Sequence, residues 1–201
     1  MAETHDKLLY IAIGLIAQKG FDAVSVREMT REAGIRESSF YNHFVSKKDL
    51  LEDIFQLLEQ NLTRDLPDMK EIQKMTQELT LRDFLVQRMR KFLEGWEQPV
   101  SKNLWFVLSQ QQYKNQRAAR IILSVTEGII RMYADAFRLL QEEGKMKECD
   151  PVSAARLYGY SVRALHLEYS LRQFSETSPG GFYHQLFENL DFLSRNMLYR
   201  C

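Results

Sequence analysis

Short polar side chains occupy one side of a helix that the sequence pattern predicts over about residues 36–43. At 100° per residue, Ser38 and Asn42 lie roughly opposite Phe40. Phe40 and Phe44 are one helical turn apart, so they share a face and are expected to anchor this helix in a core. Hydroxyl and amide groups on the opposite side can hydrogen-bond to base edges and to phosphates. The chemistry that this face offers is recognition of nucleic acid.

The side chains around this helix divide into two groups by the contacts that we expect of them. The candidates for base edges in the DNA major groove are Arg36, Ser38, Ser39 and Asn42. The candidates for phosphate contacts are Ser25, Arg27, Tyr41, His43, Lys47 and Lys48. Two alternatives stay open: the Tyr41 ring merely covers the junction between helices, and His43 serves at the end of its helix.

Three local signals predict the elements that position this face. Ser25-Val26-Arg27-Glu28 has the form of a capping box, in which the hydroxyl accepts an amide proton and the carboxylate reaches back. Gly34 is expected to end the helix that follows, because glycine enters the left-handed conformation at low cost. Ser46-Lys47-Lys48-Asp49 is a second capping box and opens a helix over about residues 47–65. Two short helices joined by a glycine turn form a helix-turn-helix, whose second helix enters the major groove.

In this segment the chain resembles the tetracycline-repressor (TetR) family of bacterial regulators. Four runs carry the resemblance: Ser25-Val26-Arg27-Glu28-Met29, Glu32-Ala33-Gly34-Ile35, Ser39-Phe40-Tyr41-Asn42-His43-Phe44 and Ser46-Lys47-Lys48-Asp49-Leu50-Leu51. Together with the Lys19-Gly20-Phe21 ending of a first helix, they cover about the first quarter of the chain. The chain departs from the usual pattern at Thr30, where the family tends to have alanine, and at Ser38, where it tends to have glycine.

The resemblance implies an architecture and a mode of action. The architecture is an all-α fold with a helix-turn-helix DNA-binding domain over residues 1–50 and a helical ligand-binding and dimerisation domain over residues 51–201. The mode of action is that of a homodimer, which binds double-stranded DNA at a palindromic operator and is released by a small-molecule effector. Repression is the default in this family.

Composition favours an all-α protein and says little about the partner. The 201 residues contain only four prolines and nine glycines, and β-branched alternation is nearly absent. Lys and Arg number 27 against 27 Asp and Glu, and residues 1–50 contain seven of each class, so the net charge gives no support for DNA binding. Arg27 and Arg31 share one helical stripe, while Glu28 and Glu32 share another. The stripes indicate either a basic DNA face or an ordinary solvated helix with paired charges.

Other function classes find little support in the sequence. No apolar stretch is long enough to span a membrane, and the first residues lack the layout of a signal peptide. Cys149 and Cys201 have no metal or redox spacing, so we expect reduced thiols and a cytoplasmic protein. The four histidines show no metal spacing, and phosphate-loop and nucleophile motifs are missing; we therefore expect no enzyme, cofactor, metal site or catalytic residue. The alternative is a helical protein-binding adaptor without specific DNA binding, which only residues 24–51 disfavour.

The helix predicted after Pro151 has two apolar arcs. One arc consists of Leu157, Tyr160, Ala164, Leu167, Leu171 and Phe174, and the other of Tyr158, Val162, Leu165 and Tyr169. A helix with two apolar faces must be buried on two sides. We expect one face in its own core and predict that the last two helices meet their copies across a two-fold axis as a four-helix bundle. The alternative is a monomer in which the long helix, over roughly residues 116–143, covers the second face.

Aromatic residues of the C-terminal part are numerous enough to line an apolar site for a hydrophobic or aromatic effector. The candidate ligand-binding residues are Trp105, Tyr113, Tyr133, Arg163, His166 and Tyr169. Of these, Arg163 and His166 would orient an anionic or polar group. The alternative for each is an ordinary place in the core or in a solvated strip.

Overall fold

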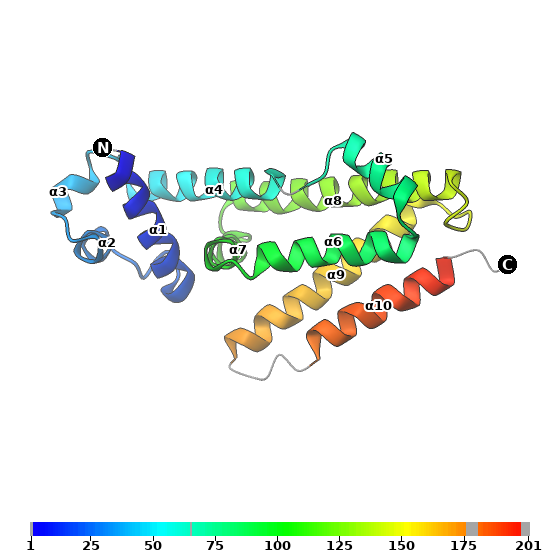
Figure 1. Ribbon diagram of the computed structural model, residues 1–201. Coiled ribbons are helices and arrows are strands. Elements are labelled where there is room, and N and C mark those ends of the chain that lie inside the picture. The colour runs from blue at the N-terminus through cyan, green and yellow to red at the C-terminus, as the bar shows by residue number, and fades with distance from the viewer. Residues whose placement is uncertain (1, 65, 176–180, 198–201) are drawn as a thin grey trace. The chain divides into compact units, whose positions relative to one another are not determined.

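The computed structural model describes residues 2–64, 66–175 and 181–197, and within these ranges the chain forms ten helices and no strand (Figure 1). The helices are α1 (Ala2–Lys19), α2 (Val26–Ala33), α3 (Glu37–Phe40), α4 (Lys47–Arg64), α5 (Met69–Glu78), α6 (Leu81–Trp96), α7 (Pro99–Gln111), α8 (Gln116–Glu142), α9 (Pro151–Phe174) and α10 (Phe182–Met197). The all-α fold expected from the sequence is confirmed. Among the described helices, none combines the length and the apolar character that crossing a membrane requires.

Side chains cap the helix starts that the sequence marks. The Glu28 amide donates to Ser25 Oγ at 3.1 Å, and the Asp49 amide donates to Ser46 Oγ at 3.2 Å. At the start of α9, the Ser153 amide donates to a carboxylate oxygen of Asp150 at 2.9 Å. These bonds satisfy amides that a helix leaves without an internal partner, so each helix begins where its capping residue stands.

The chain forms two compact units, and the first contains residues 1–66 and 93–123. Within it, α1 packs against α2, α4 and α7, and α4 packs against α7. Its largest fully buried side chains are Leu8, Ile13, Ile16, Met29, Phe40, Phe44, Leu50, Ile54, Phe55 and Leu58. The unit therefore extends past the domain boundary expected at residue 50, because α4 buries apolar side chains in the same core as α1.

The second unit contains residues 67–92 and 124–201. Its core holds an aromatic cluster from three helices, with Phe84 on α6, Tyr133 and Phe137 on α8, and Tyr158 on α9. Tyr133 meets Phe84 and Tyr158 edge-on, with ring centroids 6.2 Å and 4.6 Å apart. Edge-to-face contacts of this kind add to the stability that burial of the rings supplies.

His5 connects the start of α1 to α4. Its Nε2 atom lies 2.9 Å from Asp53 Oδ2, and its Nδ1 atom lies 3.1 Å from Asp6 Oδ1. The imidazole also stacks on Phe44, with ring centroids 4.8 Å apart. Partial burial by itself lowers the pKa of His5, but hydrogen bonds and charge from Asp6 and Asp53 outweigh it, and the net effect raises the pKa.

We predict a pH-dependent contribution of His5 to stability. Because the folded-state pKa lies above the ordinary value of 6.5, this contribution is complete below that pH and is lost as the pH rises through the folded-state pKa. His5→Gln should therefore lower the melting temperature, followed by circular dichroism, more at pH 5 than at pH 8. In a chain that also carries Asp6→Asn and Asp53→Asn, the difference between the two pH values should vanish. An equal effect at both pH values in the wild-type background would show that His5 acts by packing alone.

Candidate nucleic-acid interface

The turn between α2 and α3 depends on Gly34, which has the left-handed angles φ 70° and ψ 29°. Its amide donates to the Arg31 carbonyl at 3.1 Å, and the Ile35 amide donates to the Thr30 carbonyl at 2.9 Å. A Cβ atom on Gly34 would meet nothing within 4 Å, so the positive φ, and not the available space, requires glycine here. This turn ends α2 and directs the chain into α3, as the sequence predicts.

The α3 helix presents the predicted polar face. It is shorter than the helix expected over residues 36–43, but the amides of His43 and Phe44 both donate to the Phe40 carbonyl, at 2.9 Å and 3.0 Å, and continue its course. Phe40 and Phe44 are buried, with ring centroids 5.2 Å apart. Of the candidate residues around them, Arg36, Ser38, Tyr41 and Asn42 are exposed and Ser39 is half-buried, and Glu37 is exposed as well. Burial of the two rings therefore leaves the base-edge candidates accessible on the other side.

The candidates for phosphate contacts differ in exposure. Ser25, Arg27, Tyr41 and Lys48 are exposed, whereas His43 is half-buried. Tyr41 meets the ring of Phe40 edge-on at 5.3 Å and is still 57 % exposed, so it both covers the helix junction and offers its hydroxyl. The Ser25 hydroxyl accepts a cap hydrogen bond and keeps its own proton for donation.

Lys47 differs from the expectation, because its ammonium group binds within the chain. Nζ donates to the carbonyls of Phe21 and Val24 at 2.7 Å and 2.8 Å, and it lies 4.3 Å from the centroid of the Phe21 ring. An ammonium group has three protons to donate, and two of them are used here. We therefore assign Lys47 to holding the loop between α1 and α2, where the sequence suggested a phosphate contact. The sequence could not reveal this, since the accepting carbonyls lie more than twenty residues away.

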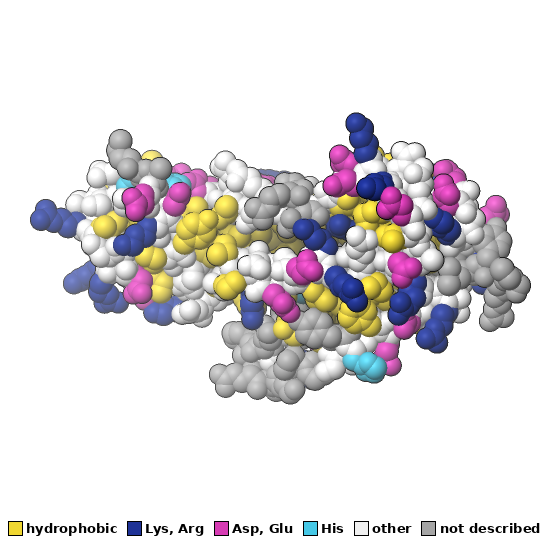
Figure 2. Space-filling model, viewed as in Figure 1, with side chains coloured by type: hydrophobic (Ala, Val, Ile, Leu, Met, Phe, Trp, Pro, Cys, Tyr) yellow, Lys and Arg dark blue, Asp and Glu magenta, His cyan; other side chains and the backbone are white. Residues whose placement is uncertain are grey.

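The two arginines of α2 are exposed, while the acidic residue Glu28 of the same helix is paired with Lys19 at the end of α1. Arg27 and Arg31 are exposed, whereas Glu28 accepts a hydrogen bond from Lys19 Nζ at 2.5 Å. This bond is the main cause that lowers the pKa of Glu28. Figure 2 shows Lys and Arg side chains projecting from the end that carries α2 and α3, with Asp and Glu side chains among them. Arg27 and Arg31 are therefore accessible to an anionic partner, although Glu32 and Glu37 are also exposed on α2 and α3.

The six ligand-binding candidates do not form one group. Tyr133, Arg163, His166 and Tyr169 belong to the second unit, and Trp105 and Tyr113 belong to the first. Trp105 packs on Trp96 at a centroid distance of 6.4 Å. Tyr113 is 93 % exposed in the turn after α7, where no helical face holds it against a core. Tyr113 is therefore the candidate that its surroundings support least, and its place at a ligand stays a prediction.

Three polar side chains of the second unit meet inside it. The rings of Tyr133 and Tyr158 touch at 4.6 Å, and burial raises the pKa of both phenols. The positive charge of Arg88 lowers the pKa of both phenols and so opposes that rise. The Nε atom of Arg88 is buried. The sequence interpretation missed Arg88, although it stands four residues from both Phe84 and Phe92 on one stripe of α6. A charged residue within an apolar stripe is the signal that could have found it.

Two predicted polar candidates have different surroundings. His166 Nε2 is buried, and its ring meets Phe92 edge-on at 5.8 Å. Burial, assisted by the charge of Arg163, lowers the pKa of His166 to about 4, so the imidazole is neutral at neutral pH. Arg163 is exposed and donates to Thr126 Oγ1 at 2.6 Å. Tyr169 packs on Phe182, with ring centroids 4.4 Å apart.

The two apolar arcs of α9 have different exposure. In one, Tyr158 is buried, and Val162, Leu165 and Tyr169 are half-buried. In the other, which we call the α9 stripe, Ala164 is exposed and the large residues Leu157, Tyr160, Leu167 and Leu171 are 54–58 % exposed. The side chain of Phe174, the remaining residue assigned to this arc, lies outside the described part. One face of α9 thus joins the core of its unit, and the other is an apolar surface of about four helical turns.

Comparisons with known proteins agree with the N-terminal motif. A family model described as "Bacterial regulatory proteins, tetR family" matches residues 8–54. The HTH-type transcriptional regulator AcrR of Shigella flexneri is 35 % identical over 60 residues, which cover 30 % of this chain and 28 % of that protein. The HTH-type transcriptional repressor KstR2 of Mycolicibacterium smegmatis is 38 % identical over 53 residues, which cover 26 % of each chain. The chain therefore matches only about a quarter of the length of these relatives.

Solved structures extend the similarity in fold to the whole chain. One is described as "Crystal structure of a putative transcriptional regulator from Saccharomonospora viridis in complex with choline". It matches with a TM-score of 0.70 over 100 % of both chains, at 18 % sequence identity. This likeness concerns the fold alone.

The neighbouring lysines at the start of α4 should respond differently to replacement by alanine. Lys48→Ala should weaken binding to all DNA sequences alike and reduce the slope of log affinity against log salt by about one unit, because it would remove one expected phosphate contact. Lys47→Ala should leave that slope unchanged and lower the melting temperature, because two carbonyls lose their charged donor. Affinity measured by fluorescence anisotropy over a salt series distinguishes them. A slope reduced by Lys47→Ala would restore its assignment to a phosphate.

Proposed function

We propose, from the premise that this chain belongs to the TetR family, that it is a DNA-binding transcriptional regulator that works as a homodimer on a palindromic operator. A small hydrophobic or aromatic effector would release it, and its action on transcription would be repression. The observation that carries the proposal is the helix-turn-helix, in which buried Phe40 and Phe44 leave Ser38 and Asn42 exposed. Similarity to a relative named as a repressor supports the direction of regulation.

The α9 stripe supports a second copy of this chain as the partner. Its residues follow one another at alternating steps of three and four, from Leu157 through Tyr160, Ala164 and Leu167 to Leu171. This spacing is that of helices that pack along a common seam, and a surface of this kind is costly to leave in water. Phe192 adds a further exposed aromatic side chain on α10. A two-fold pair of α9 and α10 helices would bury both surfaces as a four-helix bundle.

Dimerisation gives the proposed operator its symmetry. Two recognition helices related by a two-fold axis can read both halves of a palindrome only when their separation fits about 34–36 Å, one turn of DNA, or a multiple of it. An effector would act by favouring a state in which the separation of the two recognition helices does not match the operator. Its binding can weaken DNA binding only as far as it prefers that state.

The polar cluster of Arg88, Tyr133 and Tyr158 supports the second unit as the effector site. Three helices bring these side chains together among aromatic rings, and the cluster is rich in hydrogen-bond donors. An aromatic molecule with an acceptor group suits such surroundings. His166 would add a neutral imidazole, whereas Arg163 is exposed and already bonded to Thr126. A structural neighbour is described as a complex with choline, which supports small-molecule binding by this fold.

Selection of bound sequences from random DNA tests the proposed function. The wild-type protein should select a palindrome and sediment as a dimer at micromolar concentration. Leu167→Glu places a charge in the α9 stripe and should yield a monomer that binds the selected DNA roughly a hundredfold or more weakly, because it engages a single half-site. Gln73→Glu adds the same charge at an exposed position of α5 and should change neither property.

Two outcomes would contradict parts of the proposal. A wild-type protein that binds the selected pool no better than random DNA would favour the helical adaptor. A stable wild-type monomer at micromolar concentration would refute the dimer.

The buried hydroxyl of Tyr158 should matter for the effector and not for DNA. With any small molecule found to release the wild-type protein from the selected DNA, Tyr158→Phe should raise the required concentration about three- to tenfold, as expected for one hydrogen bond. DNA affinity without effector should stay the same. Tyr10→Phe makes the same change at an exposed position of α1, in the first unit, and serves as the control. Equal responses of the two variants would remove this cluster from the effector site.

A further inference from the structure

Arg117 stands where the local electrostatics of its helix disfavour it. It lies in the first turn of α8, just after Asn115, whose side-chain oxygen accepts the amides of Arg117 and Ala118 at 2.8 Å and 3.3 Å. The start of a helix carries partial positive charge and favours acidic side chains, but the first turn of α8 contains none. A residue that opposes its local preference needs a compensating interaction elsewhere in the structure.

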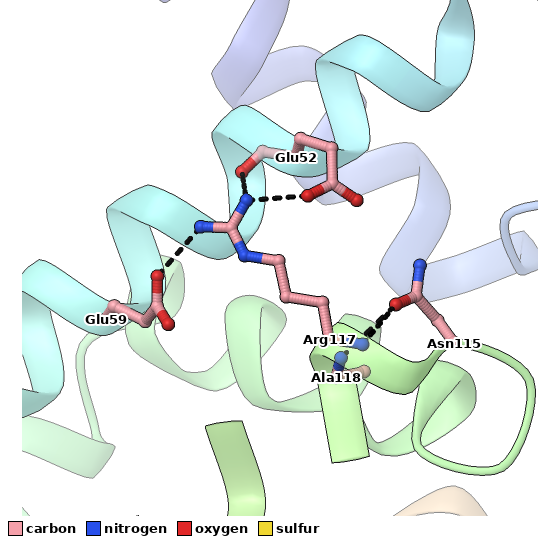
Figure 3. A network of polar contacts seen from close by, with 5 residues as sticks. All are labelled: Glu52, Glu59, Asn115, Arg117 and Ala118. Carbon is pink, nitrogen blue, oxygen red and sulfur yellow. Dashed lines mark hydrogen bonds and ion pairs between the residues drawn. The ribbon is translucent and has the colours of Figure 1, made fainter. Parts of the chain in front are cut away.

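That interaction is a bridge to two glutamates of α4 (Figure 3). Arg117 Nη1 donates to Glu52 Oε2 at 2.6 Å and approaches the Glu52 carbonyl at 3.3 Å, while Nη2 donates to Glu59 Oε2 at 2.8 Å. Glu52 and Glu59 are two helical turns apart on α4. The planar guanidinium therefore binds α4 at two positions along its length and not at a single residue. The hydrogen bonds that Arg117 donates to Glu52 and then to Glu59 raise the pKa of Arg117.

The segment that includes the end of α7 and the start of α8 also contacts α1 and the loop that follows it. Gln110 on α7 donates from Nε2 to the Ala17 carbonyl at 3.0 Å, and Lys114 Nζ lies 3.3 Å from a carboxylate oxygen of Asp22. The segment from Gln110 to Arg117 is thus bonded to the chain before α2 and to α4. All of these residues belong to the first unit.

A second set of bonds continues from α4 toward the helix-turn-helix. Lys47, in the first turn of α4, donates to the carbonyls of Phe21 and Val24, directly ahead of the cap of α2. A rotation of α4 would therefore pull on the loop that sets the start of α2. The connected elements are α8, α4 and the α1–α2 loop, each joined to the next by a charged donor.

We propose that Arg117 is a positioning residue for DNA recognition, which holds α4, and through Lys47 the helix-turn-helix, in the orientation that fits the operator. The inference rests on the proposed function and adds a residue distant from the recognition helix. Glu52 and Glu59 are 44 % and 46 % exposed, and Arg117 is 30 % exposed, so the bridge contributes little to global stability. Its main effect is on orientation. Because α8 is one helix that also carries Tyr133, a shift of α8 would reach Arg117 without an intervening loop.

The decisive comparison is Arg117→Ala with Arg120→Ala. Arg120 is exposed on the same helix, and its replacement removes the same charge. Arg117→Ala should bind the selected operator roughly tenfold more weakly, with unchanged binding to random DNA and an unchanged salt slope. Arg120→Ala should stay close to wild type. Arg117→Lys keeps the charge but lacks the planar pair of donor groups that reaches both glutamates, so its operator affinity should lie between those of the two alanine variants. Equal operator affinity of the two alanine variants would overturn the proposal.

Two further measurements separate positioning from loss of fold and from failure of the proposed function. Hydrogen exchange in the free protein should be faster in α4 for Arg117→Ala than for Arg120→Ala, with equal melting temperatures. This readout needs no DNA, and unchanged exchange would overturn the proposal even if operator binding were never observed. Combining Arg117→Glu with Glu52→Arg and Glu59→Arg reverses the charges of the bridge and should restore much of the operator affinity. If this combined variant binds no better than Arg117→Glu alone, the bridge does not set the orientation.

Discussion

Burial of Phe40 and Phe44 is the constraint on which the recognition surface depends. A helix of four residues has no stability of its own in water, because forming its first turn fixes several residues for very few hydrogen bonds. The two phenyl rings are at most 1 % exposed, and they fix the rotation of α3 relative to α1 and α2. Truncating such a ring to alanine typically costs about 3–5 kcal/mol. The exposure of Ser38 and Asn42 is a consequence of this packing, since a helix places them on the side opposite the rings.

Basic residues serve two purposes in this protein, and the net charge describes neither. Arg27, Arg31 and Lys48 remain exposed beside the recognition helix, where the field that an anionic partner meets is a local one. Lys47 and Arg117 instead use their charge inside the first unit, on backbone carbonyls and on two glutamates. In the proposed regulator, the first kind would attract DNA, and the second kind would keep the attracting surface in one orientation. The net charge of the chain therefore does not tell which basic side chains are available to an anionic partner.

The α9 helix combines two roles on opposite faces. Its buried face contributes Tyr158 to the aromatic and polar cluster of the second unit, and its exposed face carries the α9 stripe. In the proposed regulator, one helix would therefore touch both the effector and the partner subunit. A change in the packing of Tyr158 would displace the seam on the other side, because a closely packed helix moves as a body and does not deform locally.

The sequence by itself determined the local elements of this protein. Ser25, Ser46 and Asp150 mark helix starts, Gly34 marks a turn that needs a positive φ, and the spacing of apolar residues defines both faces of α9. These signals act within a few residues, so the order of the chain records them directly. Only the tertiary structure decided which charges bind within the protein and which remain available. Lys47, Arg88 and Arg117 look like ordinary basic residues in the sequence, and Tyr113 looks like a pocket residue. Their roles depend on groups brought close by packing between helices distant in sequence, and the free energy of a buried or paired charge is set by those neighbours.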